Sequence, residues 1–210
     1  MACKYGQKKI ISYLCSSICI VVFISCSSPS VNNALHIVNT DAICNGDIIC
    51  RLGNGYFSNL FRLNAGDAKR FSHIGLIQKQ NDSIYVYHTE ASELNGVGGV
   101  YKHTLDLFLE EAEDYAVYRY ACDTTVTHKI MEQALCYFNA NVPFDLAFDL
   151  SSDSTLYCSE YVANCINLTT AKNQITPSTK RGYKLYLLDD ILDKCSLIID
   201  YKDTKQKKDV

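Results

Sequence analysis

Two neighbouring segments of alternating hydrophobic residues constrain the fold of this chain more than any other feature. Residues 72–77 and 84–91 both have the pattern of a strand, and the polar stretch 78–83 between them has the composition of a turn. The sequence therefore predicts a β-hairpin. Other strand-like runs occur at residues 46–50, 100–103, 115–120 and 197–201.

Helical patterns fall between and after these strands. One helix is predicted after Thr104, which would cap it, and another is predicted to start at Thr125 or Thr127. A third is predicted to begin at or just after Cys158. The apolar face of the first helix would consist of Leu105, Phe108, Leu109 and Ala112. Because the strands cluster first and the helices flank them, the fold class is predicted to be α+β, with an antiparallel sheet packed against helices.

Composition excludes two broad classes of protein. The 210 residues are 48% hydrophobic and 20% charged, which is too apolar for a disordered chain. A net charge of −3 gives no sign of the basic surface that nucleic-acid binding requires. Residues 51–71 are rich in Gly, Asn and Arg with interspersed aromatics, and they are interpreted as a semi-ordered excursion that could cover a cleft.

The first 25 residues have the pattern of an export signal. Three lysines precede an apolar stretch, residues 10–24, that is too short for a comfortable membrane span. The small residue and Cys26 that follow resemble the cleavage and lipidation site of a bacterial lipoprotein; an ordinary cleaved signal or a short anchor are the alternatives. All three place the rest of the chain outside the cytoplasm, so we expect a bacterial envelope location, lipid-anchored through Cys26 or periplasmic.

The cysteine count is unusual for a chain of this length. Of the 11 cysteines, three lie in the predicted signal peptide and Cys26 is the predicted lipid site. The remaining ones are Cys44, Cys50, Cys122, Cys136, Cys158, Cys165 and Cys195. Their number is odd, so at least one thiol cannot pair within the chain, and none forms a Cys-x-x-Cys motif typical of structural zinc or thioredoxin-like sites.

Cys158 is the candidate nucleophile. At the start of a helix its sulfur would lie at the positive end of the helix dipole, which stabilises a thiolate and lowers the pKa from about 8.5. His73 is the candidate base, and strand alternation places it on the same face as Gly75, where the missing side chain leaves room for another element or a substrate. A buried structural cysteine and a structural histidine are the alternatives.

A third group is needed to orient the imidazole of His73. A hairpin would lay His88 and Glu90, which share one face of the next strand, beside it. The remaining histidines are isolated in the sequence and are predicted to be surface or structural residues: His36, His103 and His128. A zinc site made of Cys158, His73 and His88 lacks paired-ligand spacing, so no metal and no cofactor are predicted.

Several short motifs, taken in order, resemble one family of hydrolases. They lie at residues 46–49 (GDII), 72–75 (SHIG), 90–91 (EA), 96–97 (GV), 144–148 (FDLAF) and 157–162 (YCSEYV). Together they resemble the YiiX-like branch of the permuted NlpC-type papain-like cysteine hydrolases, over about residues 44–168. In ordinary papain-like enzymes the cysteine precedes the histidine, and the reversed order in this chain fits the permutation.

The resemblance implies a papain-like sheet packed against helices and the activity of a cysteine peptidase or amidase. Cys158 would be the nucleophile and His73 the base. The third member would be Glu90, which is narrowly preferred, or His88, since related proteins use a second histidine. The implied substrate is a cell-wall peptide, with a lipid acyl ester as the second candidate and a non-catalytic binding module on the same fold as the third.

The predicted layout of the chain follows from these assignments. Residues 1–25 are the signal peptide, 26–43 a lipid-attached tether, 44–201 the permuted papain-like hydrolase domain and 202–210 a Lys-rich tail. The predicted partners are a cell-wall peptide or lipid acyl substrate and, through a lipid on Cys26, a membrane; no nucleic-acid partner is expected.

Overall fold

An antiparallel sheet forms the centre of the computed structural model, which describes residues 40–53, 69–110, 112–152, 154–171 and 174–202. Within these residues the sheet has six strands in the order β4-β3-β2-β1-β5-β8. Its strands are β1 (Ile48–Gly53), β2 (His73–Gln80), β3 (Ser83–Ala91), β4 (Gly98–Thr104), β5 (Ala112–Tyr120) and β8 (Cys195–Asp200). The predicted hairpin is confirmed as β2 and β3, which are longer than expected and leave a turn of only two residues.

The described residues all belong to one compact unit, Asn33–Val210. The predicted signal peptide, most of the tether, the central part of the 51–71 excursion and most of the Lys-rich tail lie outside the described residues. The described part also contains the 3₁₀ helix Thr40–Ala42 and a small hairpin of β6 (Ser178–Lys180) and β7 (Tyr183–Leu185). None of the helices in the described part is both long and apolar enough to cross a membrane.

The α-helices of the described residues are α2 (Leu105–Leu109), α3 (Thr124–Asn139), α4 (Cys158–Asn167) and α5 (Leu188–Leu192). Side-chain caps precede α2 and α3. The hydroxyl of Thr104 accepts the Leu107 N–H at 3.3 Å, as predicted. Asp123 accepts the Val126 N–H at 2.9 Å, so α3 starts slightly earlier than expected. Ala112 was expected on α2, but the helix ends at Leu109 and Ala112 opens β5.

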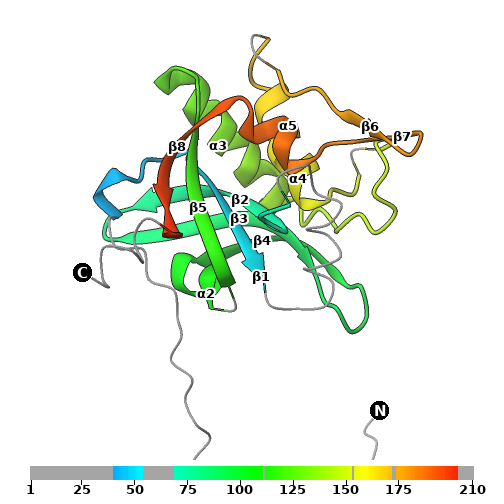
Figure 1. Ribbon diagram of the computed structural model, residues 1–210, viewed down its shortest axis with the longest axis horizontal. Coiled ribbons are helices and arrows are strands. Elements are labelled where there is room, and N and C mark those ends of the chain that lie inside the picture. The colour runs from blue at the N-terminus through cyan, green and yellow to red at the C-terminus, as the bar shows by residue number, and fades with distance from the viewer. Residues whose placement is uncertain (1–39, 54–68, 111, 153, 172–173, 203–210) are drawn as a thin grey trace, which may run out of the picture. The chain divides into compact units, whose positions relative to one another are not determined.

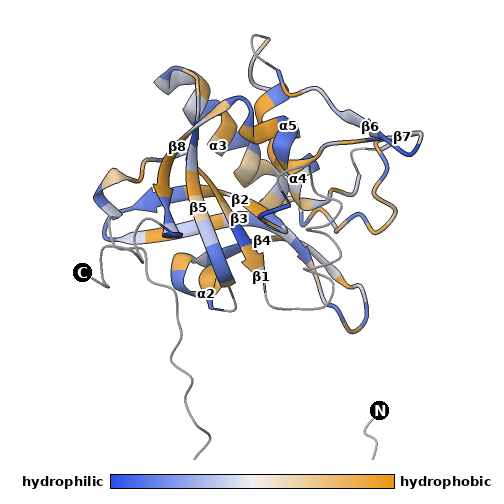
Figure 2. Ribbon diagram, viewed as in Figure 1, coloured by the Kyte–Doolittle hydropathy of each residue, from blue (hydrophilic) through white to orange (hydrophobic). Residues whose placement is uncertain are grey.

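Helices cover both faces of the sheet. Figure 1 shows α3, α4 and α5 on one side and α2 on the other. The larger hydrophobic cluster contains Ile74 and Leu76 of β2, packed with residues of α3, α4 and α5, while Ile77 of β2 belongs to the second cluster with Phe108 of α2. Figure 2 shows hydrophobic residues on the strands and helices that meet in these clusters. The alternation predicted for β2 is therefore confirmed, and it sends neighbouring side chains into different layers.

The edge strand β4 is covered by a following loop. Val100 donates its N–H to the Val142 carbonyl at 3.0 Å, and Phe144 donates to the Gly98 carbonyl at 3.0 Å. Gly99 and Pro143 form an isolated antiparallel bridge between these two contacts. The loop therefore fills hydrogen-bonding positions that an edge strand normally exposes.

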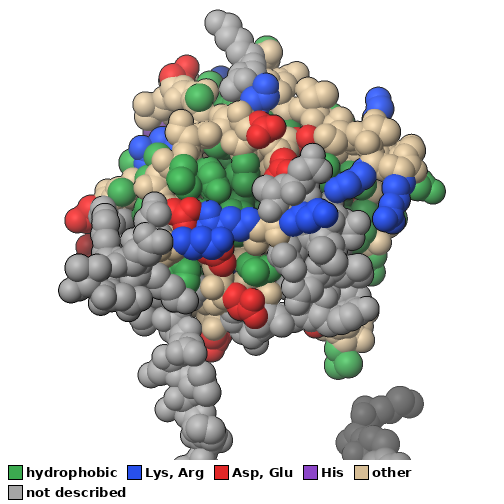
Figure 3. All heavy atoms as spheres, in the orientation of Figure 1, with side chains coloured by type: hydrophobic (Ala, Val, Ile, Leu, Met, Phe, Trp, Pro, Cys, Tyr) green, Lys and Arg blue, Asp and Glu red, His purple; other side chains and the backbone are tan. Residues whose placement is uncertain are grey.

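Ion pairs tie the chain segment before β2 to the far edge of the sheet. Arg70 binds Asp200 of β8 at 2.6 Å and Asp114 of β5 at 2.9 Å, and Lys202 lies 3.6 Å from Asp114. Figure 3 shows basic side chains directly beside acidic ones in the middle of this face. The hydrogen bonds from Arg70 hold the pKa of Asp200 below its usual value, so the pair keeps its charge at neutral pH.

A second ion pair supports the start of β1. The Asp47 side chain is only 1% exposed; its carboxylate binds Arg119 at 2.7 Å and accepts the Cys44 N–H at 2.8 Å. Asp47 therefore closes the turn that enters β1.

Replacing Asp47 with alanine is expected to destabilise the protein by about 2–3 kcal/mol, because it removes an ion pair and leaves the Cys44 N–H without its acceptor. The midpoint of urea unfolding measures this loss. The exposed Glu93, replaced in the same way, provides the control and is expected to stay within about 0.5 kcal/mol of the parent. Equal midpoints for the two variants would contradict the structural role of Asp47.

Candidate active site

Cys158 is the first residue of α4, as predicted, and the residues on both sides of it are anchored. The Glu160 carboxylate accepts the Tyr157 N–H at 3.3 Å, which holds the entry into the helix. The Tyr157 hydroxyl accepts the Tyr186 N–H at 2.7 Å, and the Ser159 hydroxyl donates to the Tyr186 carbonyl at 2.6 Å. The thiol is therefore presented from a fixed backbone position.

The sulfur of Cys158 lies where β2 and β3 stop pairing. The β2–β3 ladder ends at Leu76 and Tyr87, so Ile74 lies beyond the last pair. The backbone N–H groups of Ile74, Ser159 and Cys158 itself interact with the sulfur and favour the thiolate. This arrangement places the thiol next to the residue that follows His73 in the chain.

Burial nevertheless raises the pKa of Cys158 to about 11, and the nearby Glu90 charge acts in the same direction. The sequence-based expectation of a lowered pKa is therefore wrong for this structure. The N–H groups at the helix start lower the pKa of the thiol, but the loss of water around the sulfur raises it by a larger amount.

Alkylation of Cys158 by iodoacetamide is accordingly expected to be slow at neutral pH and still rising at about pH 10, because only the thiolate reacts. Mass spectrometry of the Cys158 peptide after timed exposure at a series of pH values measures the rate. A plateau below about pH 8 would show that the thiolate is more stable than the burial of the sulfur implies.

His73 opens β2 and makes a short contact with His88. Its Nε2 atom lies 2.8 Å from Nδ1 of His88, and its ring packs on Phe108 with the centroids 5.6 Å apart. Burial lowers the pKa of His73 well below 6.5, and the positive charge of Arg51 acts in the same direction. His73 is therefore neutral at physiological pH and can accept a proton.

His88 is fully buried and continues the contact outward. Its Nε2 atom lies 3.0 Å from Nδ1 of His103 on β4, so the three histidines form a hydrogen-bonded chain. The prediction that His103 is isolated is wrong. His73, His88 and His103 are spaced 15 residues apart on three consecutive strands, and this even spacing across two hairpins is the signal that could have revealed it.

Gly75 allows this arrangement. A side-chain carbon there would lie 2.6 Å from Val86, 3.0 Å from the Tyr87 carbonyl and 3.1 Å from the His88 Cβ atom. The space predicted at Gly75 is thus occupied by β3. The two strands approach closely enough there for the His88 ring to contact the His73 ring.

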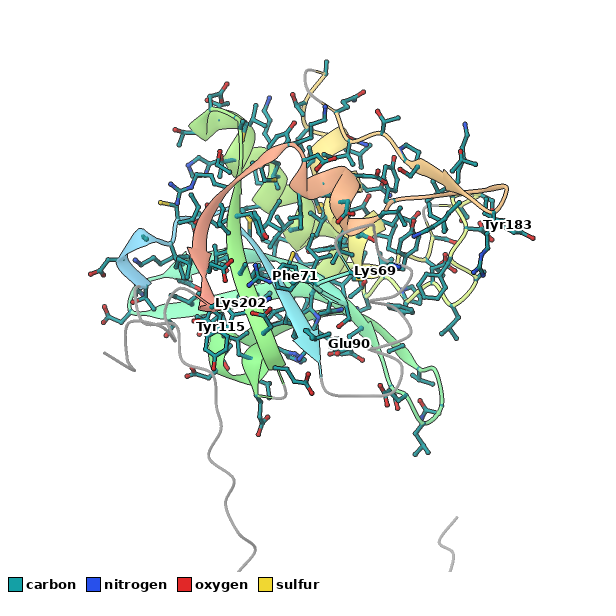
Figure 4. All side chains as sticks on the ribbon, viewed as in Figure 1. Lys69, Phe71, Glu90, Tyr115, Tyr183 and Lys202 are labelled. Atoms are coloured by element: carbon teal, nitrogen blue, oxygen red, sulfur yellow. The ribbon has the colours of Figure 1, made fainter. Side chains whose placement is uncertain are left out.

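Glu90, the narrowly preferred third member, has a different partner. Its carboxylate binds Arg51 at 2.5 Å and is 38% exposed, while Arg51 also donates to the Phe108 carbonyl at 2.7 Å. Figure 4 labels Glu90 beside β1, the strand that carries Arg51. His88, the alternative, is the residue that the structure brings to His73 Nε2.

One group of described side chains has the geometry to hold a metal ion. Ligand atoms of His88, Glu90 and His103 all lie within 4.8 Å of one another. This set differs from the Cys158, His73 and His88 combination considered from the sequence.

All the cysteines of the described residues, Cys158 included, are free thiols, and Cys158 is partly exposed.

A comparison with protein families identifies the chain. Residues 43–187 match the family described as permuted papain-like amidase enzymes (YaeF/YiiX, C92 family). The chain belongs to this family. It is thus an enzyme of the papain-like amidase and peptidase class, as the sequence motifs implied, and the predicted papain-like fold class is confirmed.

A solved structure supports the fold of this amidase. The crystal structure of the metalloprotein YiiX from Escherichia coli O157:H7 is similar with a TM-score of 0.60 and 18% sequence identity. The match covers 74% of this chain and 96% of the YiiX chain. None of the curated proteins matches the amidase.

Proposed function

We propose that the protein is a cysteine amidase in which Cys158 is the nucleophile, His73 the general base and His88 the residue that orients His73. The observation that carries the proposal is the 2.8 Å contact between His73 Nε2 and His88 Nδ1. It occupies one nitrogen of the His73 ring and leaves Nδ1 for the thiol, whose sulfur interacts with the N–H of the neighbouring Ile74.

The hydrogen-bonded chain is compatible with the tautomers that this role needs. A neutral imidazole has one donor and one acceptor nitrogen. If His73 Nδ1 is to accept the thiol proton, His73 Nε2 carries a proton and donates it to His88 Nδ1. His88 then donates from Nε2 to His103 Nδ1, so His103 acts as a positioning residue that keeps His88 in the accepting form.

The resting pair is neutral and ionises during attack. The Cys158 S–H bond breaks, its proton moves to His73 Nδ1, and the sulfur bonds to the amide carbonyl carbon. The N–H groups at the start of α4 stabilise the developing oxyanion. His73 then returns the proton to the leaving amine, and water hydrolyses the thioester with His73 again as base.

The substrate that we favour is a peptide of the bacterial cell wall. The amidase family supports an amide bond as the point of attack, and the predicted export signal supports a substrate outside the cytoplasm. A lipid acyl ester is the second candidate. Aromatic side chains favour it, because Phe148 lies 5.9 Å from Phe144 and 5.3 Å from Tyr157, the residue before the nucleophile.

Intact mass spectrometry of the acyl-enzyme tests the proposal and separates the two substrates. Short exposure to cell-wall peptides, followed by acid quenching, is expected to add a peptidyl mass that maps to Cys158. Phospholipid exposure is expected to add none. The Cys136→Ala variant, which loses an exposed thiol on α3, is the matched control and should still be acylated. A fatty acyl adduct in place of the peptidyl one would establish the second candidate.

A further inference from the structure

The outer end of the histidine chain combines three metal-binding groups. His88 and Glu90 lie on β3 and His103 on β4, and the register of the two strands places all three on one face of the sheet. His88 uses Nδ1 for His73, which leaves Nε2 directed at His103 Nδ1 at 3.0 Å. The Glu90 carboxylate completes a group whose ligand atoms lie within 4.8 Å of one another.

This spacing suits a first-row divalent ion. Zinc binds nitrogen at about 2.0–2.1 Å, so two nitrogen ligands of a tetrahedral ion lie about 3.4 Å apart. The two histidines are close to that separation already, and Glu90 needs only a side-chain adjustment to reach an ion between them. Two imidazoles and one carboxylate also favour zinc and neighbouring transition metals over calcium and magnesium, which prefer oxygen ligands alone.

We propose that His88, Glu90 and His103 bind a divalent transition-metal ion such as Zn²⁺, and that its binding switches off the base His73. The binding half of this proposal is independent of the proposed amidase mechanism, whereas the switching half rests on it.

The switch follows from the tautomers. When Zn²⁺ takes the lone pair of His88 Nε2, the single proton of the neutral His88 ring must move to Nδ1. His88 Nδ1 then donates to His73 Nε2, so the proton of His73 moves to its own Nδ1, the nitrogen to which the proposed mechanism assigns the thiol proton. His103 binds the ion through Nδ1 and keeps its proton on Nε2. Each ring holds one proton before and after. The His73–His88 hydrogen bond reverses its direction, and the His88–His103 hydrogen bond is replaced by the two bonds to the ion.

The reversed chain cannot start catalysis, because His73 Nδ1 already carries a proton and has no lone pair for the thiol proton. It does match the usual surroundings of a metal-bound histidine, whose second nitrogen donates a hydrogen bond to a neighbour. The same His73–His88 contact thus serves two exclusive states, one with an active base and one with a bound ion.

Arg51 sets the affinity of this site. Its guanidinium binds Glu90 Oε1, which leaves Oε2 for an ion but places a positive charge beside it. We therefore expect the Arg51→Gln variant to bind Zn²⁺ more tightly than the parent, by about tenfold or more. An adventitious surface site would give no such increase.

Metal titration of the full chain tests the binding half. Cobalt(II) is the spectroscopic probe and Zn²⁺ is followed by calorimetry, both in the Cys158→Ala background to remove the nucleophile thiol. One ion per chain with nitrogen and oxygen ligands is expected, without a thiolate-to-cobalt charge-transfer band. Glu90→Gln and His103→Ala are expected to weaken binding by about tenfold or more. His128→Ala, on the exposed face of α3, is the control that keeps the parent affinity. Circular dichroism confirms that each variant is folded.

Two results would overturn the site. One is loss of binding on removal of Cys158, which would place the ion at the thiol. The other is an affinity in the Glu90→Gln and His103→Ala variants equal to that of the parent. The switching half is read from hydrolysis by the protein with Cys158 intact. Zn²⁺ is expected to lower kcat, with recovery on chelation and with resistance in His103→Ala. Stoichiometric binding at this site without any change in kcat would refute the switch and leave the site.

Discussion

The Cys158→Ala variant is expected to lose amide hydrolysis by about 10⁴-fold or more, because no other group supplies the acyl acceptor. His73→Ala is expected to show a loss of the same order, since the neutral thiol then has no base. The double variant should be no worse than either single one, because nucleophile and base act as a unit. Release of a chromogenic amine from a peptide anilide gives kcat and KM for all three.

Cys165→Ser is not a suitable control, because Cys165 is fully buried in the core. Cys136→Ala removes an exposed thiol from α3 and is expected to retain the parent kcat. Residual hydrolysis in Cys158→Ala near the parent rate would rule out Cys158 as the nucleophile and leave the fold as a scaffold for another reaction.

The second large effect separates the two candidates for the third residue. His88→Ala is expected to lower kcat by about 10²- to 10⁴-fold with little change in KM, because His73 loses the acceptor that fixes its tautomer. His88→Asn keeps an oxygen acceptor for His73 Nε2 and should recover part of this loss. Glu90→Gln, by contrast, should stay within about tenfold of the parent kcat, since Glu90 pairs with Arg51.

Steady-state kinetics and thermal unfolding of the same samples measure both effects. If Glu90→Gln loses more activity than His88→Ala while both remain folded, Glu90 rather than His88 orients His73. The preference for Glu90 as the third member, drawn from the sequence, would then be correct. Failure of His88→Asn to recover any activity would indicate that His88 supports the fold rather than the base.

Much of the fold could be predicted because the sequence alternates clearly. The β2–β3 hairpin and the start of α4 at Cys158 follow from periodicity of two and of 3.6 residues. Ala112 was misassigned because its spacing fits both the end of α2 and the start of β5. Pairing of β5 with β8 on the sheet edge rests on contacts between distant residues, which local patterns do not contain.

The candidate site was predicted in part, for two physical reasons. His88 and Glu90 are two residues apart on one strand, so alternation places both on one face and cannot choose between them. The choice depends on Arg51, whose strand lies on the other side of β2 and which pairs with Glu90. His103 was missed because its contact with His88 depends on the register of β3 with β4.

The loop at residues 142–144 has a consequence for the behaviour of the protein at high concentration. An uncovered edge strand is a template on which another copy can add a strand and begin an aggregate. Here the loop already occupies Gly98 and Val100 of β4 through backbone hydrogen bonds. Copies of the protein can therefore be crowded together at high concentration with that part of the sheet edge closed to intermolecular pairing.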